Sequence, residues 1–201
     1  MKSVLISIQP KWCELIANGK KTIEVIKTKP KLETPFKVYI YCTKGELLTR
    51  SNNNGKIYVA YSRKYQKLLE RNGNITLSGK VIGEFVCDGI ISHCEMANAD
   101  IAEQQGCIKR EKIFEYSNGK ELFGWHISNL VIYDKPRELS EFKIFKKSIC
   151  PANMNGICLE REQNDVISCE NLNCSHKKLT KPPQSWCYVE GVDNNAERNE
   201  R

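Results

Sequence analysis

The sequence predicts an α+β fold in which about six or seven short strands close into a small barrel, with two or three short helices beside it. Two observations indicate this class. Apolar stretches rich in β-branched residues are short and separated by Gly, Pro and Asn, a pattern typical of strands that close on themselves and leave few exposed edges. The helical stretches follow no regular strand–helix alternation, which argues against a doubly wound sheet. A chain of 201 residues can bury one sizeable core.

In the N-terminal half, strands are expected where apolar and β-branched residues gather: 3–8, 21–28, 37–43 and 56–62. A helix over 10–19 separates the first two strands, because Pro10 suits a first helical turn and Gly19 suits a helix end. A second short helix is expected over 63–73, closing on Gly73.

The C-terminal half is less regular. A long strand over 78–93 contains Gly83 and Gly89, which are expected at bulges or bends. Residues 94–120 are predicted as helix and loop, and residues 122–136 as a strand. A weak helix or turn is expected over 137–145 and a last strand over 184–190. We expect one domain made of residues 1–146 and 179–190. A cysteine-bearing insertion loop at 147–178 interrupts it, and a disordered tail at 191–201 lacks any apolar anchor.

Charge is distributed unevenly along the chain. Residues 1–80 contain 16 Lys and Arg against 5 acidic residues, whereas residues 81–201 contain 15 against 19, and together they give the net charge of +7. This asymmetry predicts a positive surface that attracts phosphate, although a lysine-rich solvated face would give the same counts. No window approaches the roughly 18 apolar residues of a membrane span. The first residues do not resemble a secretory signal, so a cytoplasmic protein without membrane contact is expected.

The stretch around Gly19 carries a motif. Gly19, Lys21 and Glu24 follow the predicted first helix, with Ile26 two positions further on. A helix ending in Gly and then G-x-K-x-x-E-x-R resembles the ASCH domain, a branch of the PUA-like proteins, with Ile26 in the place of the arginine. Five segments in order resemble an ASCH subgroup found in Firmicutes and their phages: SVLISIQPKWCELIANGKKTIEV, VYIYCT, GKVIGEFVCD, LFGWHISNLVIYDKP and KPPQSWCYVE.

That resemblance implies a PUA-like/ASCH mixed β-pseudobarrel with short flanking helices and a cleft toward which the motif points. It also implies RNA or a nucleotide-like ligand as the partner, held in a basic cleft. The predicted ligand-binding residues are Trp12, Lys20, Lys21, Thr22, Glu24, Ile26 and Lys27. Trp12 is a candidate for base stacking, with packing of the helix on the barrel as its alternative role.

On a strand over 22–28, Glu24 and Ile26 share one face. The arginine of the family pattern would pair with the glutamate and grip a phosphate or a carboxylate through its planar fork. Isoleucine removes both functions, which leaves Lys21 as the expected partner of Glu24. Burial should then raise the pKa of Glu24.

Two further functions are compatible with the sequence. One ASCH branch hydrolyses an acyl group from a modified cytidine with a lysine base at the position of Lys21, but its threonine nucleophile corresponds to Glu24 here, and Thr22 lies two residues away. Lys21 and Glu24 are nevertheless candidate catalytic residues of a hydrolase or ribonuclease acting on RNA or a modified nucleoside, with Glu24 as general base. The phage resemblance also allows a protein that binds and blocks another macromolecule. The oligomeric state is not set by the sequence.

The other aromatic and metal-binding residue types have simpler interpretations. Trp125 and Trp186 are expected in the core, and His126 is expected as a hydrogen-bonded surface residue. Cys150, Cys158, Cys169 and Cys174 are spaced C-x7-C-x10-C-x4-C and followed by His176. Such a cluster is either a zinc site that supplies folding energy to a loop or a set of free thiols.

Overall fold

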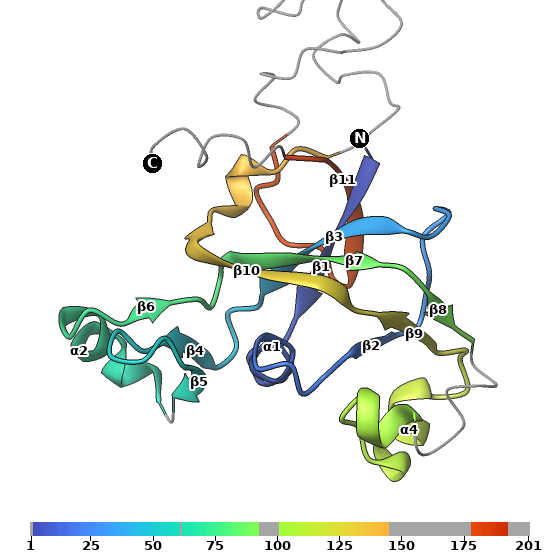
Figure 1. The fold of residues 1–201 in the computed structure, drawn as a ribbon, viewed down its shortest axis with the longest axis horizontal. Helices are drawn as coiled ribbons and strands as arrows, with labels where there is room; N and C mark the ends of the chain where they lie inside the picture. Colours follow the sequence, from blue (N-terminus) through green and yellow to red (C-terminus); the bar gives the residue numbers. More distant parts are fainter. Residues whose placement is uncertain (1, 61, 93–100, 145–177, 193–201) are drawn as a thin grey trace, which may run out of the picture.

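The computed structural model describes residues 2–60, 62–92, 101–144 and 178–192, and within them it shows an α+β fold (Figure 1). The largest sheet has five strands in the order β10–β7–β3–β1–β11. Its strands are β1 (Lys2–Ile8), β3 (Phe36–Cys42), β7 (Val81–Cys87), β10 (Ser128–Arg137) and β11 (Trp186–Glu190). β1 and β3 pair in parallel, and the other neighbours pair antiparallel, so the sheet is mixed.

Two smaller sheets flank the five-stranded sheet. One has the order β2–β9–β8, built from β2 (Ile23–Ile26), β8 (Ile90–Ile91) and β9 (Phe123–His126). Because β8 follows β7 and β9 precedes β10, this sheet continues the β7–β10 pair as it curls away from the main sheet. The other has the order β5–β4–β6, built from β4 (Leu47–Arg50), β5 (Ile57–Ala60) and β6 (Ile75–Thr76).

Short helices lie around these sheets. They are α1 (Pro10–Ala17), η1 (Arg63–Tyr65), α2 (Gln66–Arg71), the π-helical turn η2 (Ile101–Gln105), α4 (Arg110–Ser117) and η3 (Leu139–Glu141). Helix α1 begins at Pro10 and buries Cys13 and Ile16. It ends where Gly19 adopts a φ of +70°, a left-handed conformation that glycine adopts without steric cost. This turn directs the chain from α1 into β2.

The central strands of the five-stranded sheet, β1, β3 and β7, are buried on both faces. One face carries the largest core cluster, where side chains of β1 and β3 meet Cys13, Ile16, Ile26 and Trp125. The other face is covered by η3 and the segment leading to β11, with Leu139, Phe142 and Leu179 among its buried residues. Strand β3 is therefore apolar along nearly its whole length, as expected for a central strand.

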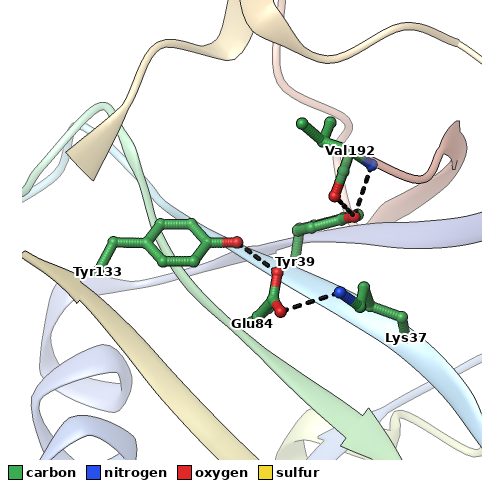
Figure 2. A network of polar contacts seen from close by, with 5 residues as sticks. All are labelled: Lys37, Tyr39, Glu84, Tyr133 and Val192. Atoms are coloured by element: carbon green, nitrogen blue, oxygen red, sulfur yellow. Dashed lines mark hydrogen bonds and ion pairs between the residues drawn. The ribbon is translucent and has the colours of Figure 1, made fainter. Parts of the chain in front are cut away.

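A polar network lies on the second face of this sheet (Figure 2). The carboxylate of Glu84 accepts hydrogen bonds from Lys37 Nζ at 2.9 Å and from the Tyr133 hydroxyl at 2.6 Å. The Tyr39 hydroxyl accepts a bond from the backbone N–H of Val192 at 2.8 Å. These contacts link β3, β7 and β10 and fix the end of the described C-terminal segment to the sheet.

Most of the predicted elements are present, with shifted bounds. The predicted strand 78–93 breaks at Asp88 and Gly89 into β7 and β8, so Gly89 lies at a bend as expected. The predicted bulge at Gly83 is confirmed by register shifts beside it, and a Cβ at Gly83 would lie 2.3 Å from the carbonyl oxygen of Val131. Strand 122–136 divides into β9 and β10. The short strands β4 and β6 were not predicted, because Leu47–Arg50 lacks an alternating pattern and Ile75–Thr76 is too short to show one.

The strands do not form a continuous hydrogen-bonded ring. Among the described residues, β10 and β11 are the edge strands of the five-stranded sheet, so the arrangement is a pseudobarrel with open edges. The sequence had favoured a closed barrel without exposed edges. In the part of the chain that the structure describes, no helix is long and apolar enough to cross a membrane. The cysteine-bearing insertion and the tail predicted from residue 191 lie, except for residues 178, 191 and 192, outside the described residues.

Candidate functional site

A pocket of about 870 Å³ lies between the start of α1, strand β2 and the segment that joins η2 to α4. Figure 1 shows β2 running from the end of α1 toward β9, with α4 drawn on the far side of β2 from α1. The volume falls within the range of small-molecule and nucleotide sites. The residues around it come from segments far apart in the sequence, including Ser7, Trp12, Glu24, Lys109 and Gln184.

Lys21 is held inside the wall of this pocket. Only 2% of the residue is exposed, and its Nζ donates a 2.6 Å hydrogen bond to the carbonyl oxygen of Gly106. The same Nζ lies 3.6 Å from Glu24 Oε2 and 5.1 Å from the centre of the Trp12 ring. The ammonium group thus ties the start of β2 to the η2–α4 segment.

Glu24 is the buried carboxylate of the pocket. It is 8% exposed, and its Oε2 has no hydrogen-bond partner apart from the ion pair with Lys21. Burial raises the pKa of Glu24 above its ordinary value, and the Lys21 ammonium opposes part of that rise. The expected pairing with Lys21 is therefore present, and the burial of Glu24 shifts its pKa in the expected direction.

Gly106 is suited to its place because no side chain would fit there. A Cβ at this position would lie 2.7 Å from the carbonyl oxygen of Ala102 and 3.3 Å from Cγ2 of Val25. The backbone of the η2–α4 segment can therefore approach β2 closely enough for the Gly106 carbonyl to receive Lys21.

Aromatic and charged side chains form the more accessible parts of the pocket. Trp12 is half-buried and Tyr116 is 41% exposed, and both line it. Burial, followed by the charge of Glu24, raises the pKa of the Tyr116 phenol. The lining residues include four lysines and two glutamates: Lys11, Lys21, Lys109, Lys112, Glu24 and Glu115. Lys112 pairs with Glu115 at 2.7 Å, whereas Lys11 and Lys109 are exposed.

Of the seven predicted ligand-binding residues, four line the pocket: Trp12, Lys21, Glu24 and Ile26. Ile26 is only 5% exposed and also contributes to the largest core cluster, which explains why an isoleucine is accommodated in so polar a run. The other three, Lys20, Thr22 and Lys27, are absent from the lining. Lys27 Nζ lies 4.7 Å from the centre of the Tyr116 ring.

The segment 107–116 supplies pocket residues that the sequence did not indicate. Lys109, Lys112 and Tyr116 reach the site because Gly106 is anchored to Lys21. In the sequence this stretch is a polar helix far from the motif at Gly19. Its lysines and aromatic residues were the only sign that it could contribute to a binding site.

The remaining candidates have structural roles. Trp125 is fully buried as expected, and its ring packs edge-on against Phe36 with centroids 5.6 Å apart. Trp186 is half-buried beside it, with ring centroids 6.0 Å apart. His126 is partly exposed, and its Nδ1 lies 2.6 Å from Asp88 Oδ1, which agrees with a hydrogen-bonded surface histidine.

A metal site is not apparent in the described part of the chain, where no group of three or more His, Cys, Asp or Glu side chains could hold an ion. The predicted zinc ligands Cys150, Cys158, Cys169 and Cys174 lie outside the described residues. Cys13, Cys42 and Cys87 are buried thiols, and burial raises the pKa of Cys87 to about 12.

Comparison with known proteins finds similarity only among solved structures. No protein-family model matches the chain, and no curated protein matches it. An ASCH protein from Zymomonas mobilis superposes with a TM-score of 0.46 at 15% identity, over 68% of this chain and 73% of the other. Two single-residue mutants of that protein give TM-scores of 0.44 and 0.45, at 15% and 16% identity over 69% and 68% of this chain and 77% and 74% of theirs. Similarity at this level carries no inference about ligand or activity.

Proposed function

We propose that the protein binds RNA or a nucleotide-like ligand in the pocket between α1, β2 and α4. The observation that carries this proposal is the combination of Trp12 and Tyr116 with lysines around one pocket of about 870 Å³. An aromatic face stacks a base, and lysine ammonium groups attract its phosphate. The resemblance of the motif at Gly19 to the ASCH domain supports the same ligand class.

The roles within the pocket follow from exposure. Lys11 and Lys109 are exposed at the pocket and are the groups assigned to the phosphate. Lys21 is 2% exposed and already bonded to Gly106 and Glu24, so it is a positioning residue that keeps Glu24 in place. Glu24, which lines the pocket, accepts a hydrogen bond from an amino or imino group of the nucleobase.

Binding of the four ribonucleoside monophosphates, followed by calorimetry, tests the proposal. We expect Trp12→Ala to weaken binding of the preferred nucleotide by roughly tenfold through lost stacking. The double variant Lys11→Gln/Lys109→Gln should weaken the binding of nucleotides more than that of the corresponding nucleosides, because only nucleotides carry phosphate. Phe114→Ala is the matched control, since Phe114 is an exposed aromatic residue that does not line the pocket. Equal affinities for the wild type and all variants, or no binding at all, would contradict the proposal.

A hydrolase is the second candidate, and the ion pair of Lys21 with a buried carboxylate of raised pKa favours it. Chromatography of the same nucleotides, of acylated nucleosides and of an RNA oligomer after incubation with the protein separates the two functions. Turnover that disappears in Lys21→Ala supports the hydrolase, whereas unchanged ligands support binding alone.

A further inference from the structure

We infer that the appendage, defined as residues 47–60 and 62–76, is a second nucleic-acid surface that contacts the phosphates and unstacked bases of a single strand. It consists of the β5–β4–β6 sheet with η1 and α2. In Figure 1 it projects from the molecule on the opposite side of α1 from α4. None of the pocket-lining residues belongs to it, so this surface is separate from the pocket.

The outer helices of the appendage, η1 and α2, leave their side chains largely uncovered. Neither η1 nor α2 buries any residue. Leu68 is 54% exposed, Tyr65 is 49% exposed, and Ile75 on β6 is 37% exposed. A helix of six residues normally gains its stability by packing an apolar face, so an uncovered apolar face here indicates a surface that a ligand covers.

The charge of the appendage identifies the chemistry of that ligand. Residues 47–76 contain six Lys and Arg and a single Glu, a net charge of +5 out of +7 for the chain. Four of these cations are exposed on η1 and α2: Arg63, Lys64, Lys67 and Arg71. The single carboxylate, Glu70, accepts bonds from the neutral groups of Gln66 at 3.0 Å and Thr76 at 2.7 Å. Within the described residues, none of the four cations forms an ion pair.

An exposed aromatic ring lies among these cations. Lys64 Nζ is 5.5 Å from the centre of the Tyr65 ring, and Leu68 follows one turn later on the same helical segment. Phosphate-binding cations interleaved with an uncovered aromatic side chain are the means by which proteins bind single strands without reading sequence. A polyanion with stacking bases complements both features, and an acidic protein segment complements only the charge.

The appendage presents this surface on a fixed support. Arg50 donates to the backbone carbonyl of Tyr133 at 2.8 Å, and the Asn18 side chain donates to the Ile57 carbonyl at 3.1 Å. Leu48 and Ile57 belong to the largest core cluster. The cations on η1 and α2 are therefore carried by a sheet anchored to α1 and β10.

Fluorescence anisotropy with a labelled RNA of about 12 nucleotides, measured over a salt series, tests this inference. The test variant is Lys64→Gln/Lys67→Gln/Arg71→Gln, and Lys29→Gln/Lys31→Gln/Lys120→Gln removes the same charge from exposed sites elsewhere. We expect the test variant to reduce the slope of log K against log salt by about 2, at roughly 0.7 for each lost phosphate contact. Tyr65→Ala should weaken RNA binding by roughly 5- to 150-fold. The control variant should bind as the wild type does.

The outcomes that overturn the inference are distinct. An equal loss of RNA affinity in the test and control variants would show a general effect of charge. If the wild type does not bind RNA, the appendage is not a nucleic-acid surface. Displacement of the RNA by polyglutamate at an equal concentration of charges would assign the surface to an acidic protein instead. Mononucleotide binding in the pocket serves as a separate readout, because the test variant should leave it unchanged. Failure of the pocket proposal therefore leaves the RNA measurement interpretable.

Discussion

At the scale of single residues, Lys21 and Glu24 form the feature that distinguishes the pocket from ordinary surface. Both are buried, and the ammonium group of Lys21 is shared between a carboxylate and the Gly106 carbonyl. An ion pair in such a place contributes little net stability as a pair, yet removing one member leaves the other charged and desolvated. The pair is thus sensitive to single substitutions.

Lys21→Met retains the aliphatic stem and removes the charge. We expect the free energy of unfolding to fall by about 3 kcal/mol, because Glu24 and the Gly106 carbonyl both lose a buried partner. Denaturant unfolding measures this change. Lys20→Met is the matched control, since Lys20 is exposed and should change stability by less than about 0.5 kcal/mol. Equal costs for the two variants would show that the buried contacts of Lys21 do not support the fold.

The raised pKa of Glu24 gives a pH dependence of defined sign. A carboxyl whose pKa is higher in the folded than in the unfolded chain binds its proton more tightly when folded. Its contribution to stability is therefore present below the ordinary value of 4.5 and is lost as the pH rises through the folded-state pKa. We expect the unfolding free energy of the wild type to fall relative to that of Glu24→Gln over this interval. Urea unfolding at successive pH values measures the difference, and Glu33→Gln, at an exposed site, should follow the wild type. Parallel curves for the wild type and Glu24→Gln would contradict the expectation.

At the scale of elements, β2 separates two environments. Ile23 and Val25 pack against Ala102 and Ile113 beneath η2 and α4. Glu24 and Ile26 alternate with them and line the pocket, which Val25 also reaches. All four residues of the strand are buried, so the apparent polarity of this run comes from the lysines on either side of it.

Ile26→Arg restores the cation of the motif next to Glu24 on the same strand. We expect phosphate-bearing nucleotides to bind about tenfold more tightly, as for one added charge-assisted hydrogen bond, with a loss of stability because Ile26 leaves the core. Calorimetric titration measures the affinity. Ile26→Met, which adds length without charge, is the control. If both variants bind as the wild type does, β2 is scaffold and not part of the binding surface.

At the scale of the whole molecule, cations gather in two places on the folded chain. At the pocket, Lys11 and Lys21 of the N-terminal half lie with Lys109 and Lys112 of the C-terminal half, and the appendage carries +5. The sequence predicted a single positive surface from the counts alone. Their separation by α1 is a property of the folded chain, because α1 packs against both β4 and β5.

The sequence by itself determined the elements whose signals are local. Pro10 and Gly19 bound α1, and the apolar run at 37–43 marked the central strand β3. It also indicated Lys21 and Glu24 as partners, since they lie three residues apart at a helix–strand junction. These outcomes depend on backbone preferences and on neighbours within one turn.

The tertiary structure alone decided which distant residues complete the site. Gly106 meets Lys21 across 85 positions of sequence, and this contact brings Lys109, Lys112 and Tyr116 to the pocket. It also decided that Lys21 is buried and that Ile26 faces both the core and the pocket, because burial depends on what packs above a strand. Local sequence sets which side chains share a face, whereas only long-range packing sets what that face meets.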